Sequence, residues 1–317
     1  MKIGISIANF SWPVPTAELG ATVSRIARMA DDAGIDSLWV MDHFFQIRLT
    51  GLPPESPMPE AYATLGFLGG QTRRIRLGTV VTSVAYRHPG VLIKTVTALD
   101  VMSGGRVIFG VGAGAPFNPA PAGPGTAFEA EGLGIPFPSL AERFERLEEV
   151  LQIAHQMWRG DQTPYEGRHY QMARPLNSPN SVQRPHPPIM IGGSGEKKTL
   201  RLVAQYADAC NLFDLPGTGF RDNLEHKLNV LRDHCKDVGR DYAEIEKTTA
   251  TNFDLGAGRE ARQAGLADLL AHLRDLAALG IGHVLLSPPG PWDEQTLEAI
   301  ASILPEAHAL PVGPTGG

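Results

Sequence analysis

The segment covering residues 76–114, RLGTVVTSVAYRHPGVLIKTVTALDVMSGGRVIFGVGAG, places the strongest constraint on the fold of this chain. Residues 75–82 are mostly β-branched and apolar and predict a strand, and residues 107–111 predict a second one. Between them, Pro89 begins a helical run that a Gly-Gly pair ends. Two apolar strands joined by a crossover helix indicate a parallel sheet that is covered on both faces. Ligands of such sheets bind at the carboxyl ends of the strands.

The same alternation continues along the whole chain. Strands are predicted at residues 2–7, 37–41, 75–82, 107–111, 189–191, 209–213, 245–253 and 283–286. Helices are predicted at residues 19–33, 61–71, 89–102, 139–158, 196–206, 219–238, 265–279 and 293–304. Strict alternation in 317 residues predicts an α/β fold, the (β/α)8 TIM barrel, as a single domain over 1–317. We expect insertion loops at 115–138, after strand 4, and at 160–188, after helix 4, and a frayed tail at 309–317.

Composition narrows the class of protein. The net charge of −6 comes without a basic cluster, which argues against a nucleic-acid partner. No apolar run approaches the roughly 18 residues of a membrane span. The opening MKIGISIANF leads directly into a predicted strand, without signal-peptide features, so we expect a cytoplasmic protein. Cys210 and Cys235 are then expected to be unpaired thiols.

Chemistry-bearing residues follow several predicted strands. Asp42 and His43 come directly after the second strand, where a histidine can bind a carbonyl or anionic group or act as an acid or base. The alternative is that Asp42 caps the next turn and His43 packs in the core. The next strand ends carry small residues that leave room for a flat ligand against the backbone: Thr82, Ser83, Gly112 and Gly114.

A glycine-rich turn, Gly193-Ser194-Gly195, lies between a short strand and a helix. Exposed amides at a helix N-terminus bind anions, although the same sequence also suits a tight turn capped by Ser194. The GxG after strand 4 lacks the third glycine and the helix of a dinucleotide-binding fold. No HxH or HExxH occurs, so no metal site is predicted.

Four sequence pieces in this order resemble the bacterial luciferase-like superfamily of flavin and deazaflavin barrels. They are IGI, SLWVMDHF, the long segment RIRLGTVVTSVAYRHPGVLIKTVTALDVMSGGRVIFGVGAG, and PPIMIGGSGEKKTLRLVAQYADACN. Within the superfamily, WVMDHF resembles the branch that uses the deazaflavin coenzyme F420.

The resemblance implies site residues one by one. Asp42 and His43 would contact the deazaflavin ring system. A non-proline cis peptide is expected at Val80-Val81, with Thr82 or Ser83 beside it. The remaining matches are Gly112, Ala113 and Gly114 along the cofactor, Asn118 as a further polar contact, and Gly193, Ser194 and Gly195 around the phosphate.

One departure bears on the reaction. The deazaflavin glucose-6-phosphate dehydrogenases carry a glutamate directly after the GxG, where this chain has Ala115 followed by Pro116. We therefore expect hydride transfer between F420 and another small organic substrate, favouring its reduction, with His43 near the reacting atoms.

Three alternatives follow from the resemblance. The chain could be an F420-dependent oxidoreductase, an FMN-dependent monooxygenase supplied with reduced flavin by a partner reductase, or a non-catalytic flavin-binding relative. The DHF sequence favours the first. The family also implies a homodimer formed through the helices at 61–71 and 89–102. Phenylalanines in loops 44–60 and 115–138 suggest a moderately hydrophobic substrate, unless they only pack those loops.

Overall fold

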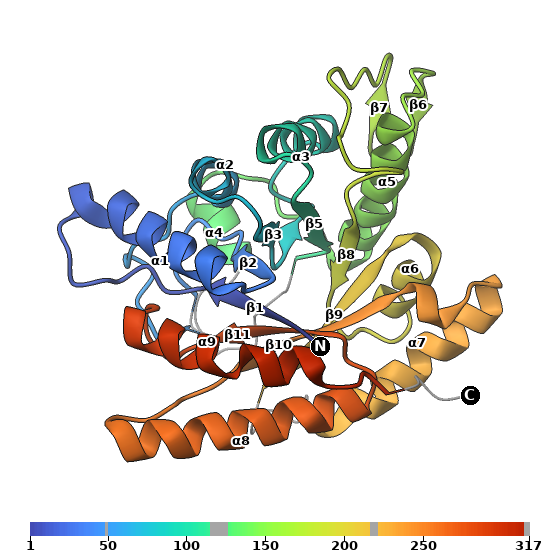
Figure 1. Cartoon of the computed structure of the whole chain (residues 1–317). Helices are drawn as coiled ribbons and strands as arrows, with labels where there is room; N and C mark the ends of the chain where they lie inside the picture. Colours follow the sequence, from blue (N-terminus) through green and yellow to red (C-terminus); the bar gives the residue numbers. More distant parts are fainter. Residues whose placement is uncertain (48–49, 115–125, 216–220, 314–317) are drawn as a thin grey trace. The chain divides into compact units, whose positions relative to one another are not determined.

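The strands form one nine-stranded sheet with the order β3-β2-β1-β11-β10-β9-β8-β5-β4, and β3 also pairs with β5 (Figure 1). Because β3 and β4 are two halves of one strand position, this is the predicted (β/α)8 barrel. The computed structural model describes residues 1–47, 50–114, 126–215 and 221–313.

The barrel strands are β1 (Lys2–Ile7), β2 (Ser37–Val40), β3 (Arg76–Thr79), β4 (Thr82–Ser83), β5 (Val107–Gly112), β8 (Ile189–Gly192), β9 (Ala209–Asp214), β10 (Glu246–Asn252) and β11 (His283–Ser287). The helices are α1 (Leu19–Ala33), α2 (Ala61–Gln71), α3 (Pro89–Ser103), α4 (Thr126–Gly132), α5 (Leu140–Trp158), α6 (Thr199–Tyr206), α7 (Leu224–Val238), α8 (Arg259–Ala278) and α9 (Glu294–Ala309). A small hairpin, β6 (Tyr165–Glu166) and β7 (Gln171–Met172), completes the regular structure of the described residues, apart from short 3-10 turns.

The chain packs as two compact units, residues 1–39, 71–76 and 190–317 in one, and residues 40–70 and 77–189 in the other. In the first unit, β1, β11, β10 and β9 pair in parallel, and α8 lies beside α9 (Figure 1). Gly4 of β1 has no room for a side chain, because a Cβ atom there would lie 2.3 Å from Ser37 Oγ. That hydroxyl accepts a hydrogen bond from Trp39 Nε1 and contacts His283 Nε2, each at 2.7 Å.

The second unit contains the ends of β3, β4 and β5, and the Asp42-His43 pair that follows β2. Here β3 and β4 pair in parallel with β5, and α3 packs against α5. Trp158 of α5 packs edge-on against Phe109 of β5 and donates a hydrogen bond to Thr97 Oγ1 of α3. Buried Asp100 of α3 accepts hydrogen bonds from the amides of Val182 and Gln183, which anchors the segment that follows the hairpin.

Most predicted elements are present within a few residues, and the differences have physical causes. The predicted strand at 75–82 is interrupted at Val80-Val81, which form a cis peptide bond. Its position confirms the peptide geometry expected from the resemblance. Segment 115–138 contains helix α4, and segment 160–188 contains the β6–β7 hairpin, so neither is loop throughout. Glycine and proline residues flank both elements and interrupt the periodic apolar pattern that would have predicted them.

The last two helices are longer than predicted. Helix α8 begins at Arg259 rather than 265, and α9 runs through Pro305 to Ala309. Pro305 lies on the exposed side of α9, where water can satisfy the carbonyl that loses its partner. In the expected frayed tail, the amide of Gly313 donates to the carbonyl of Ala277. Residues 219–220 of the predicted seventh helix lie outside the described residues.

Candidate active site

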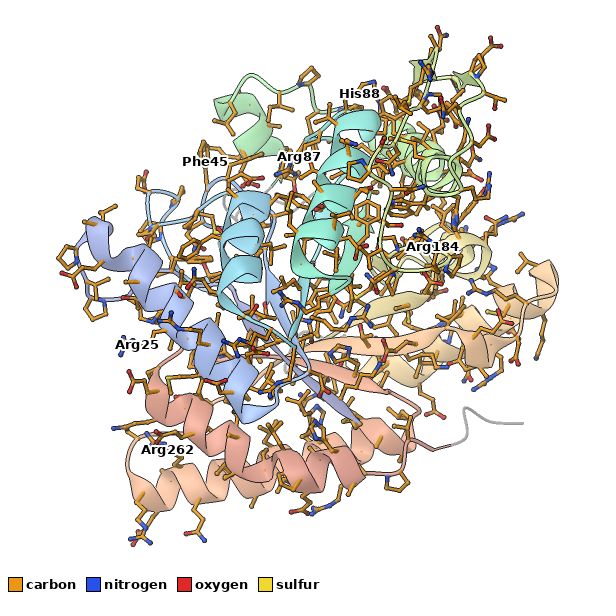
Figure 2. The ribbon with its side chains drawn as sticks, turned by 45° about the horizontal axis from the view of Figure 1, so that its top comes forward. Arg25, Phe45, Arg87, His88, Arg184 and Arg262 are labelled. Atoms are coloured by element: carbon orange, nitrogen blue, oxygen red, sulfur yellow. The ribbon has the colours of Figure 1, made fainter. Side chains whose placement is uncertain are left out.

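His43 follows β2 and is held by a buried carboxylate. Its Nδ1 atom lies 2.6 Å from Glu129 Oε2, and the side chains are 18% and 0% exposed. Glu129 comes from α4, the helix that sequence reasoning missed. The helix is seated beside the histidine by an edge-on contact between Phe128 and Phe45, the latter labelled in Figure 2.

Four groups contact the Glu129 carboxylate. Oε1 accepts from the amides of Phe44 and Phe45 at 2.6 and 3.0 Å, and Oε2 accepts from Tyr86 Oη at 2.7 Å in addition to contacting His43. Burial raises the pKa of Glu129, but the hydrogen bond and charge of His43 and the other donors outweigh it. The pKa therefore lies below its usual value. Burial and the neighbouring Glu129 raise the pKa of Tyr86, so its hydroxyl remains a donor.

Asp42 is held by an arginine side chain that the sequence did not identify as its partner. Its fully buried carboxylate forms a two-pronged pair with Arg87, at 2.5 Å from Nη1 and 2.9 Å from Nη2. Arg87, labelled in Figure 2, also reaches Glu60 at 2.5 Å, and its guanidinium lies 4.9 Å from the ring centre of Tyr62. Burial lowers the pKa of Arg87, but Asp42 more than compensates, so the pKa is raised. Asp42 therefore fixes the chain beside His43.

The cis peptide at Val80-Val81 is supported by a chain of hydroxyl groups. Tyr62 Oη lies 2.8 Å from Thr82 Oγ1, which lies 3.0 Å from Thr79 Oγ1, and Thr79 donates to the carbonyl of Gly110. Thr82 is fully buried and its hydroxyl is engaged. Val80 and Val81 themselves are partly exposed, so these two residues, rather than Thr82, can contact a ligand.

At the end of β5, too, some residues are buried and others are partly exposed. Ser83 and Gly112 are buried, whereas Ala113 and Gly114 are partly accessible. Gly114 has a φ of +77°, and a Cβ atom there would lie 2.5 Å from Ser83 Oγ. A side chain is therefore excluded at Gly114 by both conformation and space. The partly exposed residues at these strand ends include His43, Val80, Val81, Ala113 and Gly114, most of which are uncharged and suit a planar ring.

The Gly193-Ser194-Gly195 turn leads from β8 into α6. The amide of Gly193 donates to the carbonyl of Asn211, while the amides of Ser194 and Gly195 have no acceptor within the described part of the chain. Gly193 has a φ of +121°, and a Cβ at Gly195 would lie 2.8 Å from Thr199 Oγ1. Two free amides in a turn that excludes side chains at Gly193 and Gly195 fit a phosphate group. Ser194 does not cap the helix, because α6 has no side-chain cap.

Two features predicted from the sequence fall in a segment that the structure does not describe. Asn118 and the Ala115-Pro116 departure lie in 115–125, outside the described residues. Across the ranges that are described, no group of three His, Cys, Asp or Glu side chains is arranged to hold a metal ion. Nor does any helix there have the length and apolar character needed to cross a membrane.

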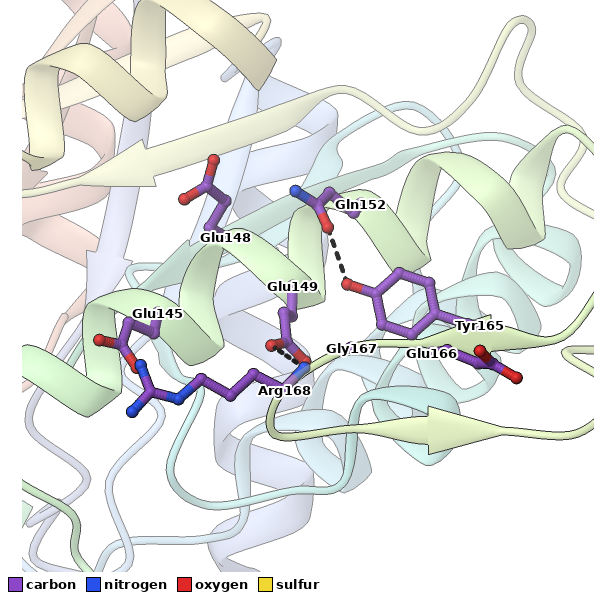
Figure 3. A pocket seen from close by; sticks show the side chains of 8 residues that line it. All are labelled: Glu145, Glu148, Glu149, Gln152, Tyr165, Glu166, Gly167 and Arg168. Carbon is purple, nitrogen blue, oxygen red and sulfur yellow. Dashed lines mark hydrogen bonds and ion pairs between the residues drawn. The ribbon is translucent and has the colours of Figure 1, made fainter.

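A separate acidic cavity of about 510 Å³ lies between α5 and the β6–β7 hairpin (Figure 3). Its central carboxylate, Glu149, accepts hydrogen bonds from the amides of Arg168, His169 and Tyr170. Tyr165 Oη donates to Gln152 from the hairpin side. These contacts fasten the hairpin to the helix, and the cavity contains none of the predicted site residues.

Comparison with known proteins identifies the family. The family model described as luciferase-like monooxygenase matches residues 1–307. The chain belongs to the luciferase-like monooxygenase family. Curated relatives include an F420-dependent glucose-6-phosphate dehydrogenase of Nakamurella multipartita, 29% identical over 80% of this chain and 69% of that protein. A protein of the same name from Microbacterium testaceum is 34% identical over 69% of this chain and 59% of its own length. This chain thus matches only part of each relative.

Solved structures with the same fold are more distant in sequence. Monooxygenase RslO1 from Streptomyces bottropensis superposes with a TM-score of 0.77 at 21% identity, covering 98% of this chain and 100% of that one. An F420-dependent secondary alcohol dehydrogenase, bound to an F420-acetone adduct, also gives 0.77 at 16% identity, covering 96% and 98%. At these identities the likeness shows the fold alone.

Proposed function

We propose that this luciferase-like protein is an F420-dependent oxidoreductase that transfers a hydride between the coenzyme and a small organic substrate, in the direction of substrate reduction. The observation that carries the proposal is the His43–Glu129 pair, because His43 follows β2 and the partly exposed Val80-Val81 and Ala113-Gly114 follow the neighbouring strands β3 and β5. A partly exposed histidine with a fixed carboxylate partner is the arrangement needed for proton exchange next to a hydride acceptor. The names of the curated relatives support F420 as the coenzyme.

In this proposal the chain's own groups have separate tasks. Val80, Val81, Ala113 and Gly114 contact the ring, and Asp42 supports the site through Arg87 rather than by touching the ring. Gly193, Ser194 and Gly195 bind the phosphate through their turn, and Asn118 remains a proposed polar contact. The bound deazaflavin would supply the hydride at C5 of its ring. His43 supplies or removes the accompanying proton on the substrate.

The residue at position 115 bears on the class of substrate. The curated relatives are named for glucose 6-phosphate, but the expected glutamate is replaced by Ala115. We therefore propose a different and moderately hydrophobic substrate.

The decisive experiment compares cofactors. Purified protein is titrated with oxidised F420 and, in parallel, with FMN, following the fluorescence of each. We expect micromolar or tighter binding of F420, a Kd equivalent to about −8 kcal/mol, and weaker binding of FMN. Tight FMN binding without F420 binding would overturn the proposal and favour the FMN-dependent monooxygenase. His43→Ala should then lower single-turnover hydride transfer about a hundredfold with a smaller change in F420 affinity.

We also propose that the protein is a homodimer that pairs through α2 and α3. A mostly apolar groove of about 660 Å³ lies along these helices. Val91 and Met102 on α3 are 62% and 82% exposed, and Phe67 on α2 is 45% exposed. Val91 and Met102 line this groove, and large exposed apolar residues in such a groove are typical of a protein interface.

A further inference from the structure

Glu129 is the most completely coordinated carboxylate near His43. Its side chain is fully buried, and its only ion pair with a described residue is the one to His43. The amides of Phe44 and Phe45 occupy one carboxylate oxygen, and Tyr86 shares the other with the imidazole. The edge-on packing of Phe44 against Tyr86, with ring centres 4.9 Å apart, holds these donors in place.

This coordination decides which nitrogen of His43 carries a proton. An ionised carboxylate can only accept hydrogen bonds, so Nδ1 at 2.6 Å must be the donor. The low pKa of Glu129 is consistent with the ionised form. With Nδ1 committed, Nε2 is the one ring nitrogen left to exchange a proton with a substrate.

We propose that Glu129 is the positioning residue of this site: it holds His43 as the Nδ1–H tautomer and reserves Nε2 for the substrate proton. This inference rests on the proposed function for its catalytic consequence. In the direction of reduction, the substrate carbon gains the hydride and its neighbouring heteroatom gains the proton from Nε2. The imidazolium thereby becomes neutral and keeps the proton on Nδ1, facing Glu129. Glu129 also stabilises the imidazolium before the transfer.

The test is Glu129→Gln, which keeps the shape of the side chain. Its amide oxygen can still accept from Phe44 and Phe45, which places an NH2 donor opposite Nδ1. We therefore expect the tautomer to reverse, with the proton moving to Nε2. Nitrogen-15 NMR of the labelled histidine reports this directly, without turnover. We further expect kcat to fall at least tenfold and the Kd for F420 to stay within about twofold.

Three companion variants keep the test decisive. Glu129→Asp retains the charge and should restore the Nδ1–H signal, even if it reacts slowly because the carboxylate is shorter. Tyr86→Phe removes one donor to Glu129 but leaves the imidazole contact, so the tautomer should be preserved. Glu149→Gln is the matched control, a buried carboxylate that also accepts backbone amides but does not touch His43.

Unchanged histidine signals in folded Glu129→Gln would overturn the inference. Equal losses of kcat, F420 affinity and melting temperature, with no tautomer change, would do the same and make Glu129 structural. A wild-type protein that neither binds F420 nor transfers a hydride would contradict the proposed function, while the NMR result would still decide whether Glu129 sets the tautomer.

Discussion

The buried pair between Asp42 and Arg87 makes a quantitative prediction about the support of the site. Asp42→Asn removes the charge from a fully buried carboxylate that receives two hydrogen bonds from Arg87. Breaking a buried pair costs about 3–5 kcal/mol because the remaining charge is left uncompensated. Arg87 keeps Glu60 as a partner and is 14% exposed, so part of its charge remains compensated. We expect the free energy of unfolding to fall by about 2–3 kcal/mol.

The measurement is urea unfolding of the wild type, Asp42→Asn, Arg87→Gln and the double variant at one pH. The double variant should be less destabilised than the sum of the two single changes, with a coupling of about 1–3 kcal/mol. Glu60→Gln is the control: its carboxylate is 38% exposed, and its loss should cost less than about 1 kcal/mol. Additive single changes, or a loss below about 0.5 kcal/mol in Asp42→Asn, would refute a supporting role for Asp42.

Three further predictions concern other parts of the molecule. Gly193→Asp should weaken F420 binding more than Gly193→Ala does. Both substitutions strain a backbone φ of +121°, but only aspartate adds a negative charge that repels phosphate. Equal losses of F420 affinity in the two variants would refute the role of charge. Burial raises the pKa of Glu246, but His283 and Lys2 lower it to about 2. The contribution of ionised Glu246 to the free energy of unfolding is therefore present above pH 4.5 and is lost as the pH falls through 2. Glu246→Gln should cost at most about 1 kcal/mol at pH 7, since the carboxylate is 31% exposed, and the difference should vanish below pH 2 in denaturant titrations. Met102→Glu should convert the proposed dimer into a monomer, as measured by light scattering. A wild-type protein that is already monomeric in the same measurement would refute the proposed dimer.

The sequence was most informative where local patterns determine structure. The alternation of apolar strands and helices predicted the barrel, and the resemblance placed the cis peptide at Val80-Val81, where the structure has it. The assignment of the glycine-rich turn also rests on residues that are neighbours in sequence. Its proposed role in binding phosphate stays a prediction.

Long-range pairing is what the sequence could not reveal. Glu129 is 86 residues from His43, and its short helix is preceded by a run rich in glycine and proline. The segment AFEAEG, compact and helix-forming between breakers, was the available signal for α4. Arg87, the partner of Asp42, is 45 residues away and could not be identified as its partner from the sequence.

The pairing of β1 with β11 also determines when the barrel can close during synthesis. Lys2 lies opposite His283, so this edge of β1 has no partner until nearly all of the chain has been made. Contacts between such distant residues form late, because the entropy of closing the loop is lost before they are gained. Until then the apolar first strand presents open backbone groups, which favour association with other chains. We therefore expect the amide of Lys2, which donates to the carbonyl of Gly282 on this edge, to gain protection late in pulse-labelled hydrogen exchange. We also expect newly made chains to aggregate unless this edge of the strand is covered.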